Sequence, residues 1–87
     1  MKVIIVYDVN IERITTIRKI LKQYLSWVQN SAFEGELTEG RLEELKSRLY
    51  EVIDPNTDSI IVYTISNPRW VDKRVWGVEK GGTDNIL

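Results

Sequence analysis

Two short segments that lie far apart in the chain are apolar on both of their faces. Residues 3–6 read Val-Ile-Ile-Val, and in residues 59–65 both alternating sets of side chains consist mainly of Ile, Val, Thr and Tyr. Side chains along a strand point alternately to its two faces, so such runs are typical of central strands covered on both sides. A chain with two such strands needs apolar material above and below its sheet.

Two amphipathic segments can supply one of these covers. Asn10 is an N-cap candidate, and apolar residues recur every three or four positions from there to Leu25. Thr38 caps a second segment with the same periodicity that runs to Val52. The stretch 27–37 between them predicts either a tight hairpin or one bulged strand, and both remain open.

The order strand, helix, hairpin, helix, strand predicts an α+β, ferredoxin-like βαββαβ fold over residues 1–66, with both helices on the same face of an antiparallel sheet. The other face then needs a partner, which a homodimer packed sheet against sheet would provide. Residues 67–87 form a C-terminal extension, expected as an extra strand or arm with a disordered end. We expect it to pack on the partner subunit or to exchange with it, and the alternative is that its tryptophans cover the core of their own chain.

The composition leaves few kinds of chemistry open. The 87 residues, 43% apolar and 29% charged, predict a single globular domain. There is no cysteine and no histidine, which excludes disulfides, thiolate zinc sites and imidazole bases. Hydrolysis would therefore rest on carboxylates with a hard metal ion. The N-terminal apolar run is too short for a signal peptide or a membrane span, so we expect a cytoplasmic protein.

The charge balance excludes a globally basic surface, because the formal net charge is −1. Any contact with nucleic acid must be local. Arg13, Arg18 and Lys22 are the candidates for such contact, and the last two lie four residues apart on one helix face. The alternative is that they are ordinary solvated charges.

Asp8 is the candidate metal-binding and catalytic residue. It follows the most apolar run of the chain, where an acid is rare, although it could also be a turn-forming residue before the first helix. One carboxylate alone is a poor Mg²⁺ site. In a homodimer whose two-fold axis passes near the ends of the first strands, two Asp8 side chains would face each other and could hold the ion.

Three further residues are candidates for nucleic-acid contact. The rings of Tyr7 and Phe33 could stack on a base, or they could simply pack in the core. Ser31 could contact a phosphate, or it could satisfy a local turn.

Four motifs resemble those of the CRISPR-associated protein two family over residues 1–66. In order they are Val6-Tyr7-Asp8-Val9, Gln29-Asn30-Ser31-Ala32-Phe33-Glu34-Gly35, Leu37-Thr38 and Asp58-Ser59-Ile60. The resemblance implies a ferredoxin-like homodimer in which Asp8 binds Mg²⁺ at the subunit interface. It also implies a role in spacer acquisition, in which the dimer bridges two copies of the CRISPR integrase and holds duplex DNA.

The resemblance also implies a possible activity. Some family members are described as endoribonucleases on single-stranded RNA and others as nucleases on double-stranded DNA. Here Val9-Asn10-Ile11 replaces the further acids that often follow the aspartate, so we expect the adaptation role first and catalysis second. The alternatives are a free-standing, toxin-like nuclease and a small-molecule-binding module. A small-molecule-binding module would be expected to have glycine-rich loops at the helix starts, which the sequence does not contain.

Overall fold

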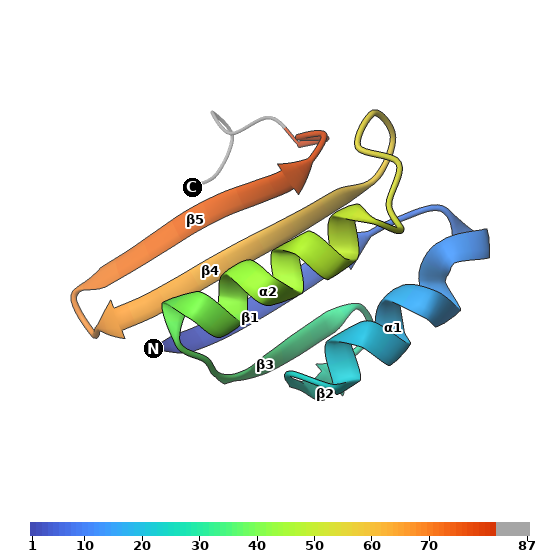
Figure 1. Ribbon diagram of the computed structural model, residues 1–87. Coiled ribbons are helices and arrows are strands. Elements are labelled where there is room, and N and C mark those ends of the chain that lie inside the picture. The colour runs from blue at the N-terminus through green and yellow to red at the C-terminus, as the bar shows by residue number, and fades with distance from the viewer. Residues whose placement is uncertain (82–87) are drawn as a thin grey trace.

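The structure is a computed structural model and describes residues 1–81. In chain order its elements are β1 (Lys2–Asp8), the 3-10 helix η1 (Ile11–Arg13), α1 (Ile14–Lys22), β2 (Ser26–Gln29), β3 (Ala32–Glu36), α2 (Glu39–Tyr50), β4 (Ser59–Asn67) and β5 (Trp70–Gly77). The five strands form one antiparallel sheet in the order β2-β3-β1-β4-β5. Both helices cover the same face of this sheet (Figure 1). The α+β, ferredoxin-like prediction is confirmed.

Strand alternation divides the sheet into two faces. In β1, the side chains of Val3, Ile5 and Tyr7 are buried, while those between them are less so. The same alternation in β4 buries Ile60 and Val62. These residues pack with the apolar stripes of α1 and α2 into one core. Its fully buried members include Val3, Ile5, Ile17, Leu21, Phe33, Leu42, Leu45, Leu49, Ile60 and Val62.

The helix starts follow the predicted caps. The Asn10 side chain accepts a hydrogen bond from the Glu12 amide, and Thr38 Oγ1 accepts one from the Arg41 amide, at 3.1 Å in both cases. Each bond satisfies an amide that has no partner within its helix. The first helical segment differs from the prediction, because it opens as the 3-10 turn η1 and the α-helix ends at Lys22.

The middle segment combines the two predicted alternatives. β2 and β3 form a hairpin, and the pairing register shifts between Trp27 and Gln29, which marks a bulge. Asn30 turns the chain with φ of 48°, a left-handed conformation that asparagine adopts more readily than most residues. The hairpin places β3 beside β1.

The C-terminal extension continues the sheet of its own chain, since β5 pairs with β4 along nearly its full length. Its two tryptophans have different environments. Trp76 is 3% exposed and belongs to the core, whereas Trp70 is 72% exposed at the hairpin tip. Exchange of this extension with a partner stays a prediction, and its predicted disordered end lies outside the described residues.

Within residues 1–81, no helix is long and apolar enough to cross a membrane.

A buried carboxylate, that of Asp58, ties the ends of several elements together. Asp58 immediately precedes β4, and its side chain is 1% exposed. It accepts hydrogen bonds from Arg13 Nε at 2.6 Å and Nη2 at 2.9 Å, from the Asn10 amide at 3.0 Å and from the Asp54 amide at 2.9 Å. Its backbone oxygen accepts from the Val78 amide at 2.8 Å. We call this set the Asp58 clamp.

The clamp stabilises the charged form of Asp58. The hydrogen bonds from Arg13 lower the pKa of the carboxyl from 3.8 to about 2, with the backbone amides contributing, and together they outweigh the opposing effect of burial. Because the pKa is lower in the folded state, the resulting stability is present above the unfolded value near 3.8 and is lost as pH falls toward 2.

Gly77, the last residue of β5, lies where two chain segments approach closely, and this position requires a glycine. Its φ is +85°, and a Cβ placed there would lie 2.2 Å from the Asp58 backbone oxygen. The Gly77 amide donates to the Tyr50 hydroxyl at 2.9 Å. Glycine at this position therefore lets the end of β5 approach the clamp.

We predict that Asp58→Asn destabilises the fold at neutral pH by about 2–4 kcal/mol, because Arg13 keeps its charge in a partly buried site after its partner is neutralised. The difference in unfolding free energy from wild type should shrink as pH falls from 4 to 2. Urea denaturation at several pH values measures both effects.

The matched control is Asp72→Asn, since Asp72 is an exposed acid that also pairs with an arginine, Arg74. Its cost should stay below about 1 kcal/mol. A loss at Asp58→Asn as small as that of the control, or independent of pH between 4 and 2, would refute the clamp as a source of stability.

We further predict that Gly77→Ala destabilises the fold by about 2–4 kcal/mol, through the positive φ and the contact with backbone. Gly40 lies in α2, and a Cβ added there would have nothing within 4 Å. Gly40→Ala should therefore be neutral or stabilise by up to about 1 kcal/mol. Thermal unfolding of both variants tests this, and equal melting temperatures would contradict it.

Candidate functional site

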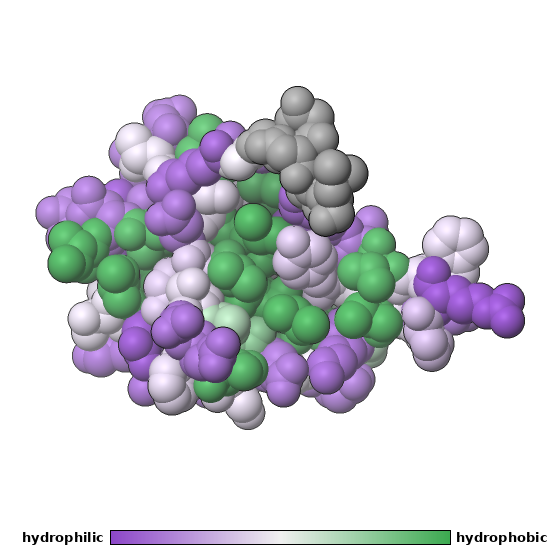
Figure 2. Space-filling view, turned by 180° about the vertical axis from the view of Figure 1, so that it is seen from behind, coloured by the Kyte–Doolittle hydropathy of each residue, from purple (hydrophilic) through white to green (hydrophobic). Residues whose placement is uncertain are grey.

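The face of the sheet that the helices leave uncovered carries an apolar row. Val6 pairs with Ala32 on one side and Ile61 on the other, and Ile61 pairs with Val75, so four strands contribute to the row. Seen from behind, apolar side chains gather across the middle of this face (Figure 2). We call it the open face. The side chains of the row are only partly buried in the single chain.

Asp8 lies at one end of the open face. It is the last residue of β1, two positions beyond Val6, and it pairs in register with Ser59. Its side chain is 73% exposed. The carboxylate therefore stands at the edge of the apolar row and is accessible to a ligand or to a second chain.

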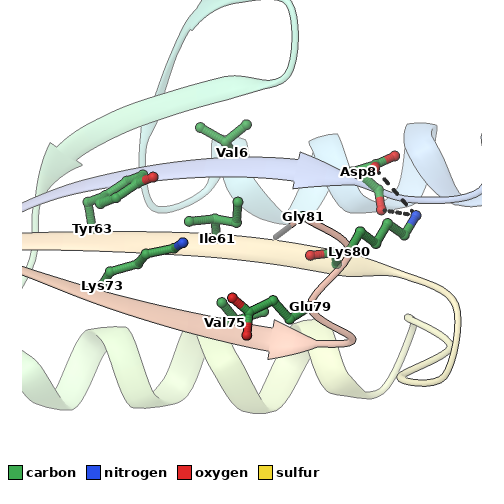
Figure 3. A pocket seen from close by; sticks show the side chains of 10 residues that line it. Val6, Asp8, Ile61, Tyr63, Lys73, Val75, Glu79, Lys80 and Gly81 are labelled. Atoms are coloured by element: carbon green, nitrogen blue, oxygen red, sulfur yellow. Dashed lines mark hydrogen bonds and ion pairs between the residues drawn. The ribbon is translucent and has the colours of Figure 1, made fainter. Parts of the chain in front are cut away.

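A lysine from the far end of the chain reaches this carboxylate. Lys80 Nζ lies 3.4 Å from Asp8 Oδ2 and donates to the Asp8 backbone oxygen at 3.2 Å. The close view shows Lys80 extending from the segment after β5 toward Asp8 (Figure 3). Between them and the sheet lies a hollow of about 290 Å³, whose floor includes Val6, Ile61 and Val75.

A single chain offers Mg²⁺ the right type of ligand atom at Asp8, but too few such ligands. Asp8 supplies carboxylate oxygens, the ligands that Mg²⁺ prefers. Among residues 1–81, however, no three His, Cys, Asp or Glu side chains come together as a metal-binding group. A site built on Asp8 thus needs a donor from another molecule, such as the Asp8 of a second copy.

The two aromatic candidates lie in the core. Phe33 is fully buried, Tyr7 is 6% exposed, and their ring centroids are 6.3 Å apart. Both side chains point to the helix side of the sheet, away from the open face. Neither ring presents a face on which a base could stack in this arrangement.

The remaining polar candidates are dispersed. Arg13 is held by Asp58 in the clamp. Ser31 sits at the turn of the β2–β3 hairpin, and its backbone oxygen accepts a hydrogen bond from the Tyr7 amide at 3.1 Å. The structure does not bring either residue into contact with Asp8.

Arg18 and Lys22 lie on α1, in the helix layer. The Arg18 guanidinium is 5.5 Å from the centroid of the Trp27 ring, which is itself half exposed. Lys22 is exposed in the last turn of the helix. These basic groups therefore belong to a different surface from that of Asp8.

Two residues that matter here are not identified as site residues from the sequence, namely Lys80 beside Asp8 and Asp58 in the clamp. Lys80 carries no local signal, because its partner Asp8 is 72 positions away. Asp58 does carry one, since an acid directly before a strand that is apolar on both faces must either be solvated or be paired. Its partner Arg13 looks, in the sequence, like one more exposed basic residue.

Comparison with known proteins assigns a family. The sequence profile of the family described as CRISPR associated protein Cas2 matches residues 1–73. A protein of Thermodesulfovibrio yellowstonii named CRISPR-associated endoribonuclease Cas2 3 is 50% identical, over 97% of this chain and 96% of its own. A Methanosarcina acetivorans protein named CRISPR-associated endoribonuclease Cas2 is 44% identical over the full length of both chains.

Solved structures agree with this assignment. One described as the crystal structure of cas2 has a TM-score of 0.73 and 42% identity, covering 100% of this chain and 98% of its own. The Streptococcus pyogenes Cas2 structure has a TM-score of 0.69 and 38% identity, covering 76% of this chain and 87% of its own. Because the family profile matches residues 1–73 and the relative and the solved structure match over 97% and 100% of the chain, this chain belongs to the Cas2 family of CRISPR-associated proteins.

Proposed function

We propose that this protein acts as a homodimer, joined through the open faces, that holds DNA during CRISPR spacer acquisition and carries a Mg²⁺-dependent nuclease site at the dimer interface. The observation that carries the proposal is the position of Asp8 at the edge of an apolar face that the two helices leave uncovered (Figure 1). We place this function in the cytoplasm, in keeping with the absence of cysteine.

The apolar row supports the choice of a second copy as partner. A two-fold axis through this face would pack identical rows of Val6, Ile61 and Val75 against each other and remove their side chains from water. Because Asp8 lies two residues beyond Val6 on the same strand face, an axis near this end brings the two Asp8 side chains together. The single Asp8 of each chain would then form a pair of carboxylates at the dimer interface.

The pair of carboxylates suits phosphodiester cleavage without histidine. When bound, Mg²⁺ polarises a phosphodiester oxygen and lowers the pKa of a bound water. The two Asp8 side chains would hold the cation and fix its place relative to the interface. Relatives at 44–50% identity are named endoribonucleases, which favours RNA as substrate, and we propose single-stranded RNA. Double-stranded DNA is the alternative.

The helix layer supports a separate role in holding nucleic acid. Arg18 and Lys22 are free of the clamp that occupies Arg13, and they lie on the layer that would face outward in the dimer. Phosphates of duplex DNA are the ligands that such basic side chains suit. Roles for Ser31, Tyr7 and Phe33 in nucleic-acid contact stay predictions. The integrase is the proposed partner of the DNA-bound dimer.

We predict that Ile61→Lys weakens the dimer by at least about 100-fold in dissociation constant, because a charged side chain would be buried without a partner in the interface. Sedimentation or light scattering over a concentration series measures the change. Ser47→Lys adds the same charge on the exposed side of α2 and should leave the dimer intact. A monomeric wild type, or equal dimerisation of both variants, would refute the proposed interface.

We predict that Asp8→Asn reduces Mg²⁺-dependent cleavage by at least about 100-fold while the dimer mass stays unchanged, because the variant loses the charge that holds the ion. Labelled single-stranded RNA and duplex DNA are the substrates, each assayed with Mg²⁺ and with chelator. A matched control is Asp72→Asn, which changes an exposed acid on the edge strand β5.

The outcomes separate the possible functions. Cleavage that needs both Mg²⁺ and Asp8 supports the interface site as catalytic. Duplex binding by an intact dimer without cleavage limits the proposal to holding DNA. Cleavage that survives Asp8→Asn would contradict the assigned site, and a protein that cleaves without any effect on spacer acquisition would favour the free-standing nuclease.

A further inference from the structure

The chain bends sharply after β5 and returns over the open face. Gly77 makes the bend with its φ of +85°, and the amide of the next residue, Val78, donates a hydrogen bond to the Asp58 backbone oxygen. In register, Gly77 lies across β4 from Asp8, since both pair with Ser59. The bend therefore directs the following residues back toward Asp8.

Lys80 completes this return, with its ammonium 3.4 Å from the Asp8 carboxylate and 3.2 Å from the backbone oxygen of the same residue. Two acceptors of Asp8 thus meet one cationic donor. Glu79 and Gly81 line the hollow together with Val6 and Ile61, so the segment lies over part of the apolar row (Figure 3).

We propose that Val78–Lys80 is a latch that holds the Asp8 carboxylate in an ion pair and that a divalent cation must displace Lys80 in order to bind there. This inference rests on the proposed function, because it concerns the same carboxylate. The ammonium occupies an oxygen that the cation would use, and its charge repels a second cation at that distance. Metal binding and the closed latch are therefore in competition.

The geometry indicates a weak latch. Lys80 is 39% exposed and Asp8 is 73% exposed, so water screens the ion pair, and pairs of this kind contribute little. The latch should lower Mg²⁺ affinity by a modest factor. Because the segment also covers part of the open face, a second copy that packs on this face would meet the latch and must either displace it or include it in the interface.

The first measurement is a calorimetric titration of Mg²⁺ into wild type, Lys80→Gln and Lys73→Gln. Lys73 lines the same hollow and loses the same charge on substitution, but no ion pair joins it to Asp8 in the described structure. We expect Lys80→Gln to bind Mg²⁺ about two- to fivefold more tightly than wild type, in line with the weakness of exposed ion pairs, and Lys73→Gln to change less. Asp8→Asn establishes which part of the binding depends on this carboxylate.

The second measurement needs no metal. Heteronuclear ¹H–¹⁵N NOE values of the amides of residues 78–81 report how firmly the segment is held, and they should fall in Asp8→Ala. Adding Mg²⁺ to wild type should lower them in the same way. If the values in Asp8→Ala equal those of wild type, the latch is refuted, whether or not the protein binds Mg²⁺.

The two proposals fail in different ways. If wild type and Lys80→Gln bind Mg²⁺ equally well through Asp8, the latch is overturned and the metal site stands. A larger gain in Lys73→Gln than in Lys80→Gln would assign the effect to general charge and would also overturn the latch. If neither protein shows binding that depends on Asp8, both the metal site and the competition are refuted.

Discussion

Asp58 joins three parts of the chain that are distant in sequence, namely residues 10–13, the turn before β4 and the segment after β5. Its carboxylate oxygens accept hydrogen bonds from the Arg13 guanidinium in the first helical turn, from the Asn10 amide after β1 and from the Asp54 amide before β4. Its backbone oxygen accepts a hydrogen bond from the chain after β5. Lowering its pKa from 3.8 to about 2 corresponds to about 2–3 kcal/mol, a large part of the stability of a domain of this size. The same contacts fix the chain just after Asp8, at Asn10, and the start of the segment that carries Lys80, so the clamp helps to position the candidate site as well as to stabilise the fold.

The sheet imposes a second constraint, because two helices can cover only one of its faces. β1 and β4 are apolar on both sides, and the helix side is fully used by side chains such as Ile5 and Val62. The opposite side offers Val6, Ile61 and Val75 in one row, and within residues 1–81 no helix or strand packs over it. A hydrophobic row of this kind favours association, and the two-fold arrangement lets a single sequence supply both halves.

The sequence predicted those features that depend on local pattern. Strand alternation and the caps at Asn10 and Thr38 indicated the elements and their order, and an acid after an apolar run indicated Asp8. Features that depend on pairing between distant segments were not predictable. Arg13 meets Asp58 across 45 positions, and Lys80 meets Asp8 across 72. For Phe33, core packing was one of two alternatives that the sequence left open, and its burial follows from its pairing with Ile5 in β1. The middle segment was ambiguous because it contains both a turn at Asn30 and a bulge after Trp27.

The separation of the basic helix layer from Asp8 has consequences for how the protein works. Arg18 and Lys22 lie on α1 on one side of the sheet, whereas Asp8 stands at the edge of the other side. A duplex held by the helix layer would lie on the outer surface of a dimer formed through the open faces. The paired carboxylates would lie at the centre of that dimer. In the proposed function, nucleic acid held on the outer layer would therefore not be the strand presented to the carboxylates. Holding and cleaving would then be separable activities of one fold, and either could be lost by substitution without the loss of the other.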